Sequence, residues 1–171
     1  MGIFQKLANK IILYIYSRGK VLYEENRYDS YRKKYQIESN FRFNGNGILF
    51  YGNGKIVIGK KSYVGSLSTI QATPGHCVKI GNRCQISHNV RMYTSSADPD
   101  QVFTIQKTKP IKAGDITIGD GVWIGANVFI GPGITIGNNA VIGANSMVTK
   151  NIPQKAIFGG VPAKLIRYKN Y

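Results

Sequence analysis

Aliphatic side chains recur every six residues through the C-terminal half of the chain. They are Ile118, Ile124, Ile130, Ile136, Ile142 and Val148, and a glycine follows five of the six immediately. A helix would need a period of about 3.6 and an isolated strand a period of 2, so neither explains the pattern. A six-residue period with glycine at a fixed place predicts short strands joined by tight corners.

The same phase occurs earlier in the chain, at Ile58, Val64 and Ile70 and, after a shift of four residues, at Ile80, Ile86 and Met92. If short strands stack coil upon coil, each aliphatic side chain lies on the equivalent one below it. Burial of one such side chain contributes roughly 1.5–3 kcal/mol, so this column can form the hydrophobic core. The pattern therefore predicts an all-β fold, a parallel β-solenoid.

Two segments interrupt the six-residue rhythm. Four residues, Pro74 to Cys77, are inserted between two coils, and a longer polar segment over residues 93–115 precedes the array that resumes at Ile116. Loops this long are uncommon inside compact domains and are usually functional. We expect residues 93–115 to leave the solenoid as an extended loop and to return to it in phase.

The flanks of the repeat have a different composition. Residues 2–16 place Ile3, Leu7 and Ile11 on one stripe, which predicts an amphipathic helix that ends near Gly19. Residues 20–40 are charged and rich in tyrosine, which is compatible with a second helical piece. After the array, a turn at residues 159–162 is followed by basic residues that we expect to leave as a tail.

This organisation predicts three parts. They are an N-terminal helical segment over residues 1–40, a β-helix over 41–155 with the loop at 93–115, and a C-terminal tail over 156–171. Residues 1–17 would either pack on the solenoid or a neighbouring chain, or contact an anionic membrane surface peripherally. No apolar stretch approaches the length of about 20 residues that spans a membrane.

The composition narrows the possible partners. Lys and Arg number 23 against 8 Asp and Glu, a net charge of +15, which favours anionic partners. Two cysteines, Cys77 and Cys84, exclude a disulfide-rich scaffold and favour a reduced, cytoplasmic protein, with the inner face of the membrane as a second possible location. Because no nucleic-acid-binding motif accompanies the charge, nucleic acid is not expected as a partner.

Three segments carry a family resemblance: Ile116–Gly137, Val141–Lys150 and the sequence Gly-Val-Pro-Ala-Lys at 160–164. They resemble the hexapeptide-repeat acyltransferases, above all the sugar and polysaccharide O-acetyltransferases related to galactoside and maltose acetyltransferases. The resemblance covers about residues 45–168 and implies a left-handed β-helix, a homotrimer, and acetyl-CoA bound between neighbouring prisms. Handedness rests on the resemblance alone, because β-crossovers are normally right-handed.

The resemblance also implies a mechanism without a metal or an acyl-enzyme. A histidine takes the proton of a sugar hydroxyl, which attacks the thioester of acetyl-CoA directly within a ternary complex. The positions matched to coenzyme binding are Trp123, Ala126, Ala144, Thr149, Lys150 and Arg167. Trp123 would line the pantetheine channel, Thr149 and Lys150 would meet the adenosine end, and Arg167 would reach the phosphates.

The catalytic histidine departs from the family pattern. Relatives often carry it in a pattern like Thr-Ser-x-His-Asp at the start of the loop, where this chain has Ala97. The chain has two histidines. His88, expected at an outward corner just before the loop, is the first candidate for the base, and His76 is the second.

Other functions stay open at this point. One is N-acetylation of a nucleotide-linked amino sugar, and another is a non-catalytic solenoid, which Ala97 suggests. Two histidines are too few for the three metal ligands that a γ-carbonic anhydrase needs.

Overall fold

The computed structural model describes residues 2–98 and 111–170, which form a helical unit up to Lys34 and a β-unit from Tyr35 onward. The helical unit is one helix, α1 (Ile3–Lys34). Three basic residues in its last turn interact favourably with the negative end of the helix dipole. The helix runs through Gly19, so the prediction that it ends there is wrong; one glycine inside a helix costs only about 1 kcal/mol relative to alanine.

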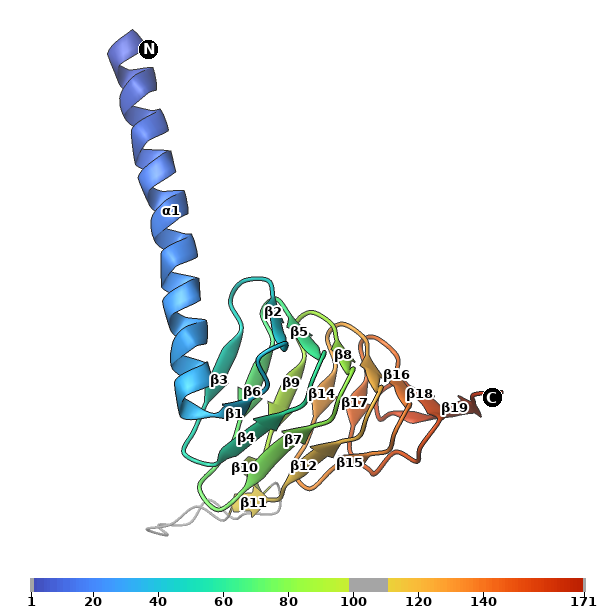
Figure 1. Cartoon of the computed structure of the whole chain (residues 1–171). Coiled ribbons are helices and arrows are strands. Elements are labelled where there is room, and N and C mark those ends of the chain that lie inside the picture. The colour runs from blue at the N-terminus through green and yellow to red at the C-terminus, as the bar shows by residue number, and fades with distance from the viewer. Residues whose placement is uncertain (1, 99–110, 171) are drawn as a thin grey trace. The chain divides into compact units, whose positions relative to one another are not determined.

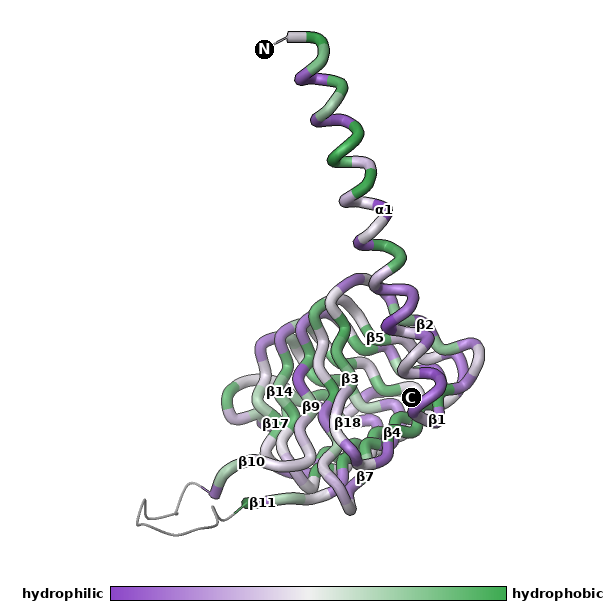
Figure 2. Tube along the Cα trace, turned by 90° about the vertical axis from the view of Figure 1, so that its left-hand side faces the viewer, coloured by the Kyte–Doolittle hydropathy of each residue, from purple (hydrophilic) through white to green (hydrophobic). Residues whose placement is uncertain are grey.

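The apolar side chains of α1 are not confined to the predicted stripe. Six consecutive residues, 11 to 16, are large and apolar or aromatic, and all of them are more than half exposed within this chain. Figure 2 shows hydrophobic segments recurring along the first half of the helix. Within the part of the chain that the structure describes, no helix is both long and apolar enough to cross a membrane.

The β-unit is a solenoid whose coils each contribute one strand to each of three sheets (Figure 1). The first sheet contains β1 (Gln36–Ile37), β4 (Lys55–Ile58), β7 (Cys77–Ile80), β12 (Ile116–Ile118) and β15 (Thr135–Ile136). The second contains β2 (Arg42–Asn44), β5 (Tyr63–Gly65), β8 (Gln85–Ile86), β13 (Trp123–Ile124), β16 (Val141–Ile142), β18 (Ala156–Gly159) and β19 (Lys164–Tyr168). The third contains β3 (Leu49–Tyr51), β6 (Thr69–Gln71), β9 (Arg91–Tyr93), β14 (Phe129–Ile130) and β17 (Met147–Val148). Apart from β18–β19, the pairs within these sheets are parallel, which confirms the predicted solenoid.

The core is the predicted column of aliphatic side chains. In the second sheet Ile86, Ile124 and Ile142 stand in register on neighbouring strands, and each is fully buried. Equivalent columns run through the first sheet, by Ile80, Ile118 and Ile136, and through the third, by Met92, Ile130 and Val148.

At Gly119, Gly125 and Gly137 the glycine after the aliphatic residue has a packing cause. A Cβ at Gly125 would lie 2.6 Å from the backbone N of Ala144 in the next coil, and one at Gly119 would lie 2.8 Å from the backbone N of Asn138. Real Cβ atoms do not approach backbone so closely, and glycine therefore allows the coils to stack at strand spacing.

Both interruptions of the repeat fall at the same corner of the prism. We call it the third-to-first corner, where the chain leaves the third sheet and begins the next coil; among the described residues it comprises 52–54, 72–76, 94–98, 111–115, 131–134 and 149–151. The long loop leaves as β10 (Ser95–Ala97) and returns as β11 (Ile111–Ala113), which pair antiparallel. Residues 99–110 of the predicted loop lie outside the described residues.

The C-terminal residues do not leave as a tail. Strand β19 turns back after residues 160–163 and pairs antiparallel with β18, so it extends the second sheet. The prediction of a tail is wrong because the chain reverses at residues 160–163 and the backbone of Lys164–Tyr168 pairs with β18.

Candidate functional site

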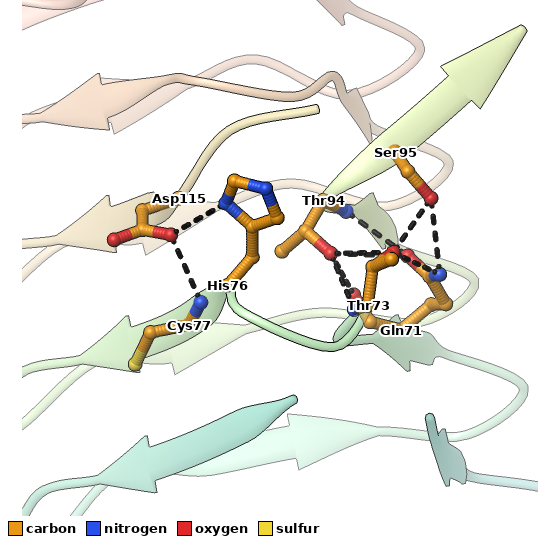
Figure 3. A network of polar contacts seen from close by, with 7 residues as sticks. All are labelled: Gln71, Thr73, His76, Cys77, Thr94, Ser95 and Asp115. Carbon is orange, nitrogen blue, oxygen red and sulfur yellow. Dashed lines mark hydrogen bonds and ion pairs between the residues drawn. The ribbon is translucent and has the colours of Figure 1, made fainter. Parts of the chain in front are cut away.

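The third-to-first corner brings together two residues that are 39 positions apart. His76 stands in the turn before β7, and Asp115 stands just before β12, the neighbouring strand. Nδ1 of His76 lies 3.0 Å from Oδ1 of Asp115, and the same carboxylate oxygen accepts the backbone N–H of Cys77 at 3.0 Å. Figure 3 shows the imidazole directed to the carboxylate from the turn, with its other ring nitrogen on the side away from Asp115.

These contacts keep Asp115 ionised. The N–H of Cys77 and the bond with His76 lower the pKa of the Asp115 carboxyl below its ordinary value, because both favour the charged form. By contrast, burial raises the pKa of the Cys77 thiol, and the negative charge of Asp115 raises it further. Cys77 is therefore a thiol at neutral pH and a poor nucleophile.

A cavity of about 360 Å³ opens at the same place and is lined by His76, Cys77, Asp115 and Lys55, among others. It offers an imidazole, a carboxylate and an ammonium group to a bound molecule. A larger cavity, of about 720 Å³, lies around Glu38 and Asp120 and has no histidine or cysteine among its lining residues. Size alone does not identify the site, since the imidazole paired with a carboxylate lines the smaller cavity.

A polar network fixes the first arm of the loop to the same corner (Figure 3). Gln71 donates to Thr73 at 2.7 Å and to Ser95 at 3.2 Å, and the hydroxyl of Thr94 accepts the backbone N–H of Thr73 at 2.8 Å. The second arm is tied in by Gly114, whose N–H donates to the carbonyl of Thr94 at 2.9 Å. Both ends of the loop are thus anchored beside the turn that carries His76.

His88 lies at a different corner, where the chain passes from the second to the third sheet. It is exposed, as predicted, and its Nδ1 accepts the backbone N–H of Ser66 at 3.1 Å. A backbone N–H always carries its proton, so Nδ1 is the unprotonated nitrogen and the neutral ring carries its proton on Nε2. In this geometry His88 has no free ring nitrogen that could accept a proton.

Two of the predicted coenzyme residues share the corner of His88. Ala126 and Ala144 occupy the equivalent positions in the next two coils, as the register of Ile86, Ile124 and Ile142 shows. Along this corner an asparagine ladder joins the coils, Asn89 to Asn127 to Asn145, with bonds of 2.9 Å. The coils are therefore linked to one another along this corner, which carries the small side chains of Ala126 and Ala144.

Trp123 and Arg167 lie on the outer face of the second sheet. They belong to one ladder of paired residues in which Val141 and Ile157 stand between them. Three strand spacings of about 4.8 Å separate the two by roughly 14 Å. Trp123 is 54% exposed within this chain. An exposed indole and a guanidinium on one flat face suit an extended ligand with an apolar arm and an anionic end.

Thr149 and Lys150 do not lie on the outer face of the second sheet with Trp123 and Arg167. Both are exposed and follow β17 at the third-to-first corner, in the second coil beyond Asp115. Within one chain the predicted coenzyme residues therefore fall into two groups, at two different edges of the prism.

Ala97 lies exposed on β10, paired with Ile111 of β11. The family position for the base is thus on the arm of the loop, at the corner that His76 and Asp115 occupy.

Sequence reasoning missed Asp115 altogether. The signal was present in the phase of the repeat, since the register pairs Ile116 with Val78 and so sets Asp115 opposite Cys77, next to His76. Aligning the two interruptions on that phase would have placed the carboxylate beside the imidazole.

The comparisons with known proteins agree with this fold. Residues 115–150 match the family described as bacterial transferase hexapeptide (six repeats). The chain is 37% identical over 134 residues to the polysialic acid O-acetyltransferase of Escherichia coli O1:K1 / APEC, an alignment that covers 77% of this chain and 42% of the relative. The chain thus spans less than half the length of that curated relative.

Two solved structures extend the likeness. A maltose O-acetyltransferase from Clostridium difficile 630 is 29% identical, with a TM-score of 0.63 over 86% of this chain and 76% of that one. AntD, an N-acyltransferase from Bacillus cereus whose structure contains coenzyme A, is 24% identical with a TM-score of 0.64 over 81% and 79%, a likeness of fold alone. These matches confirm the predicted resemblance, and the hexapeptide repeat identifies the solenoid as a left-handed β-helix.

Proposed function

We propose that this hexapeptide-repeat protein transfers an acetyl group from acetyl-CoA to a hydroxyl group of a sugar or glycan. The observation that carries the proposal is the agreement of two similar proteins, a polysialic acid O-acetyltransferase by sequence and a maltose O-acetyltransferase by fold, both named for O-acetylation of a sugar or glycan. The N-acyltransferase AntD supports coenzyme A as the acyl carrier for this fold.

The chemistry needs few groups from the chain. An imidazole removes the acceptor's proton, the oxygen attacks the thioester carbonyl, and the coenzyme thiolate leaves without any bond to the protein. The raised pKa of the Cys77 thiol agrees with transfer that forms no acyl-enzyme. Sequence reasoning names His88 as the base and His76 as the second candidate.

The residues matched to coenzyme binding fit an extended anionic ligand. Trp123 and Arg167 would hold the pantetheine arm and the phosphates on the outer face of the second sheet, with backbone contacts from Ala126 and Ala144. Thr149 and Lys150 would reach the adenosine end from a neighbouring copy, because their corner faces away from that sheet within one chain. A homotrimer of the chain would join the two groups, and sedimentation as a monomer at micromolar concentration would contradict it.

The charge of the chain favours an acidic acceptor. With a net charge of +15, the protein would attract a polyanionic glycan more strongly than a neutral sugar. We therefore expect faster transfer to polysialic acid than to maltose at low ionic strength, with the difference shrinking as salt is added. Equal rates for both acceptors at low salt would argue against an acidic glycan.

The test is thiol release from acetyl-CoA in the presence of polysialic acid, maltose and a nucleotide-linked amino sugar. O-acetylation predicts thiol release with a hydroxyl acceptor and a product that hydroxylamine cleaves. A product that resists hydroxylamine would instead show N-acetylation. Coenzyme binding without thiol release from any acceptor would show a non-catalytic solenoid.

A further inference from the structure

We infer that His76, oriented by Asp115, is the group that accepts the acceptor's proton, at a position where the family motif has no histidine. This inference rests on the proposed acyl transfer. The imidazole of His76 lies at the same corner of the prism as Ala97, where the family motif has its histidine. His88 would then have a structural role in place of a catalytic one.

The first argument is the protonation of the His76 ring. The carboxylate of Asp115 is ionised and can only accept a hydrogen bond, so Nδ1 of His76, 3.0 Å away, must be the donor. A neutral ring has one N–H, and Nε2 is then the nitrogen with the free lone pair. Within the described residues, no protein atom is hydrogen-bonded to Nε2. His76 is thus held in the form that a general base needs.

The second argument is that His88 carries its proton on the other ring nitrogen. The N–H of Ser66 occupies the lone pair of Nδ1, so a neutral ring keeps its proton on Nε2. To accept a proton there, His88 would have to exchange tautomers and break a bond that joins two coils. The hydrogen bond between His88 and Ser66 joins two neighbouring coils, as the bond between Asn89 and Asn127 does beside it. We therefore assign His88 a structural role.

The third argument is location. The side chain of His76 is 31% exposed and lines a cavity of about 360 Å³, which leaves room for an acceptor hydroxyl beside the imidazole. Both arms of the long loop are anchored beside it through Thr94 and Gly114. Lys150, expected to bind the coenzyme, lies on the same corner, three coils from His76 and roughly 14 Å away at ordinary strand spacing.

The step balances as a proton and acyl transfer. Nε2 of His76 takes the proton as the acceptor oxygen forms its bond to the thioester carbon. When the C–S bond breaks, the thiolate of coenzyme A takes that proton from Nε2, which restores the neutral ring and releases a free thiol. Asp115 keeps its charge throughout and acts as a positioning residue that favours the transient imidazolium.

The tautomers can be measured without any activity. With histidine labelled by ¹⁵N, long-range proton–nitrogen spectra above pH 7.5 should show one ring protonated on Nδ1 and the other on Nε2. His76→Asn should remove the Nδ1-protonated ring from the spectrum, since the chain has two histidines. If His76 proves to be protonated on Nε2, the assignment is overturned.

The kinetic test uses thiol release with acetyl-CoA and polysialic acid. Asparagine at position 76 can still donate to Asp115 but has no atom at the place of Nε2, so His76→Asn should lower kcat by about 10²–10⁴-fold with acetyl-CoA binding unchanged. His88→Asn, which can still accept the N–H of Ser66, should lower kcat far less. Asp115→Asn should lower kcat and move the acidic limb of the pH–rate profile to lower pH, whereas its control Asp120→Asn should move neither.

The outcomes separate the two proposals. Full activity of His76→Asn, or greater loss from His88→Asn than from His76→Asn, overturns the assignment of the base while acyl transfer stands. Equal and complete loss from both variants, with coenzyme binding intact, likewise overturns the exclusive role of His76. If the unmodified chain binds acetyl-CoA and never releases thiol, the proposed function fails and the assignment fails with it.

Discussion

Replacing Gly125 by alanine tests the close stacking on which the whole site is built. The new Cβ would lie 2.6 Å from the backbone N of Ala144, whereas ordinary contact begins at 3.4 Å. The coils would have to separate locally by the difference, about 0.8 Å. The bonds from Gly125 N–H to the carbonyl of Ile142 and from Asn145 N–H to that of Ala126, both 2.8 Å, would stretch to about 3.6 Å and be lost.

The expected cost follows from these two effects. Two lost hydrogen bonds cost about 1 kcal/mol each and the overpacking costs about 1–3 kcal/mol more, while alanine returns about 0.4–1 kcal/mol through the unfolded state. The net prediction is a loss of about 2–4 kcal/mol in the free energy of unfolding.

Gly143 provides the matched control, since it follows Ile142 as Gly125 follows Ile124. Its Cβ would meet its nearest neighbour, the carbonyl of Phe158, at 3.5 Å, an ordinary contact. Gly143→Ala should therefore leave stability unchanged or slightly higher. Urea unfolding followed by the fluorescence of Trp123, the single tryptophan of the chain, measures both variants at one protein concentration. Equal stability of the two variants would refute the stacking argument.

Three further predictions concern charge and the helix. Lys150→Ala should weaken acetyl-CoA binding severalfold in a calorimetric titration and leave kcat at saturating coenzyme unchanged; unchanged affinity would remove Lys150 from the coenzyme site. Because the folded-state pKa of Asp115 is lowered, its contribution to stability is present above the ordinary value of 3.8 and is lost as pH falls through the folded pKa. Between about pH 5 and about pH 2 the unmodified chain should therefore lose more stability than Asp115→Asn, and parallel curves would contradict this. Since α1 is apolar on all sides between residues 11 and 16, protein packing suits it better than a membrane surface, which favours a one-sided helix. Deleting residues 1–17 should leave flotation on anionic vesicles unchanged, and flotation that the deletion abolishes would assign the helix to the membrane.

The repeat was predictable because one physical demand recurs at every coil. A buried aliphatic residue is needed in every coil, and glycine is needed after it where the next coil's backbone lies close, as at Gly119 and Gly125, so the period survives in the sequence. The path of the C-terminal strand was not predictable in this way, because β19 pairs antiparallel with a register shift after Ile157 and lacks the period. The length of α1 departs from the prediction because one glycine costs only about 1 kcal/mol, too little to end a helix whose residues continue on both sides of Gly19.

The places of the candidate site residues were predictable directly where they lie on the repeat, and elsewhere only by aligning the two interruptions on its phase. Trp123, Ala126 and Ala144 stand at the positions that the period assigns to them. The pair of His76 and Asp115 arises from two insertions that a solenoid stacks at one corner, and neither insertion has a period of its own. The tautomers of the two histidines depend on single hydrogen bonds, which composition and spacing do not encode.

Thiol release coupled to ester formation tests the central claim most directly. The unmodified chain is incubated with acetyl-CoA and polysialic acid, and the free thiol and the hydroxylamine-cleavable acetyl groups on the glycan are both counted. The proposed function predicts one acetyl ester for each thiol released, at a rate that falls about 10²–10⁴-fold in His76→Asn. Thiol release without acetyl on the glycan, or no release from polysialic acid, maltose or an amino sugar nucleotide, would contradict it.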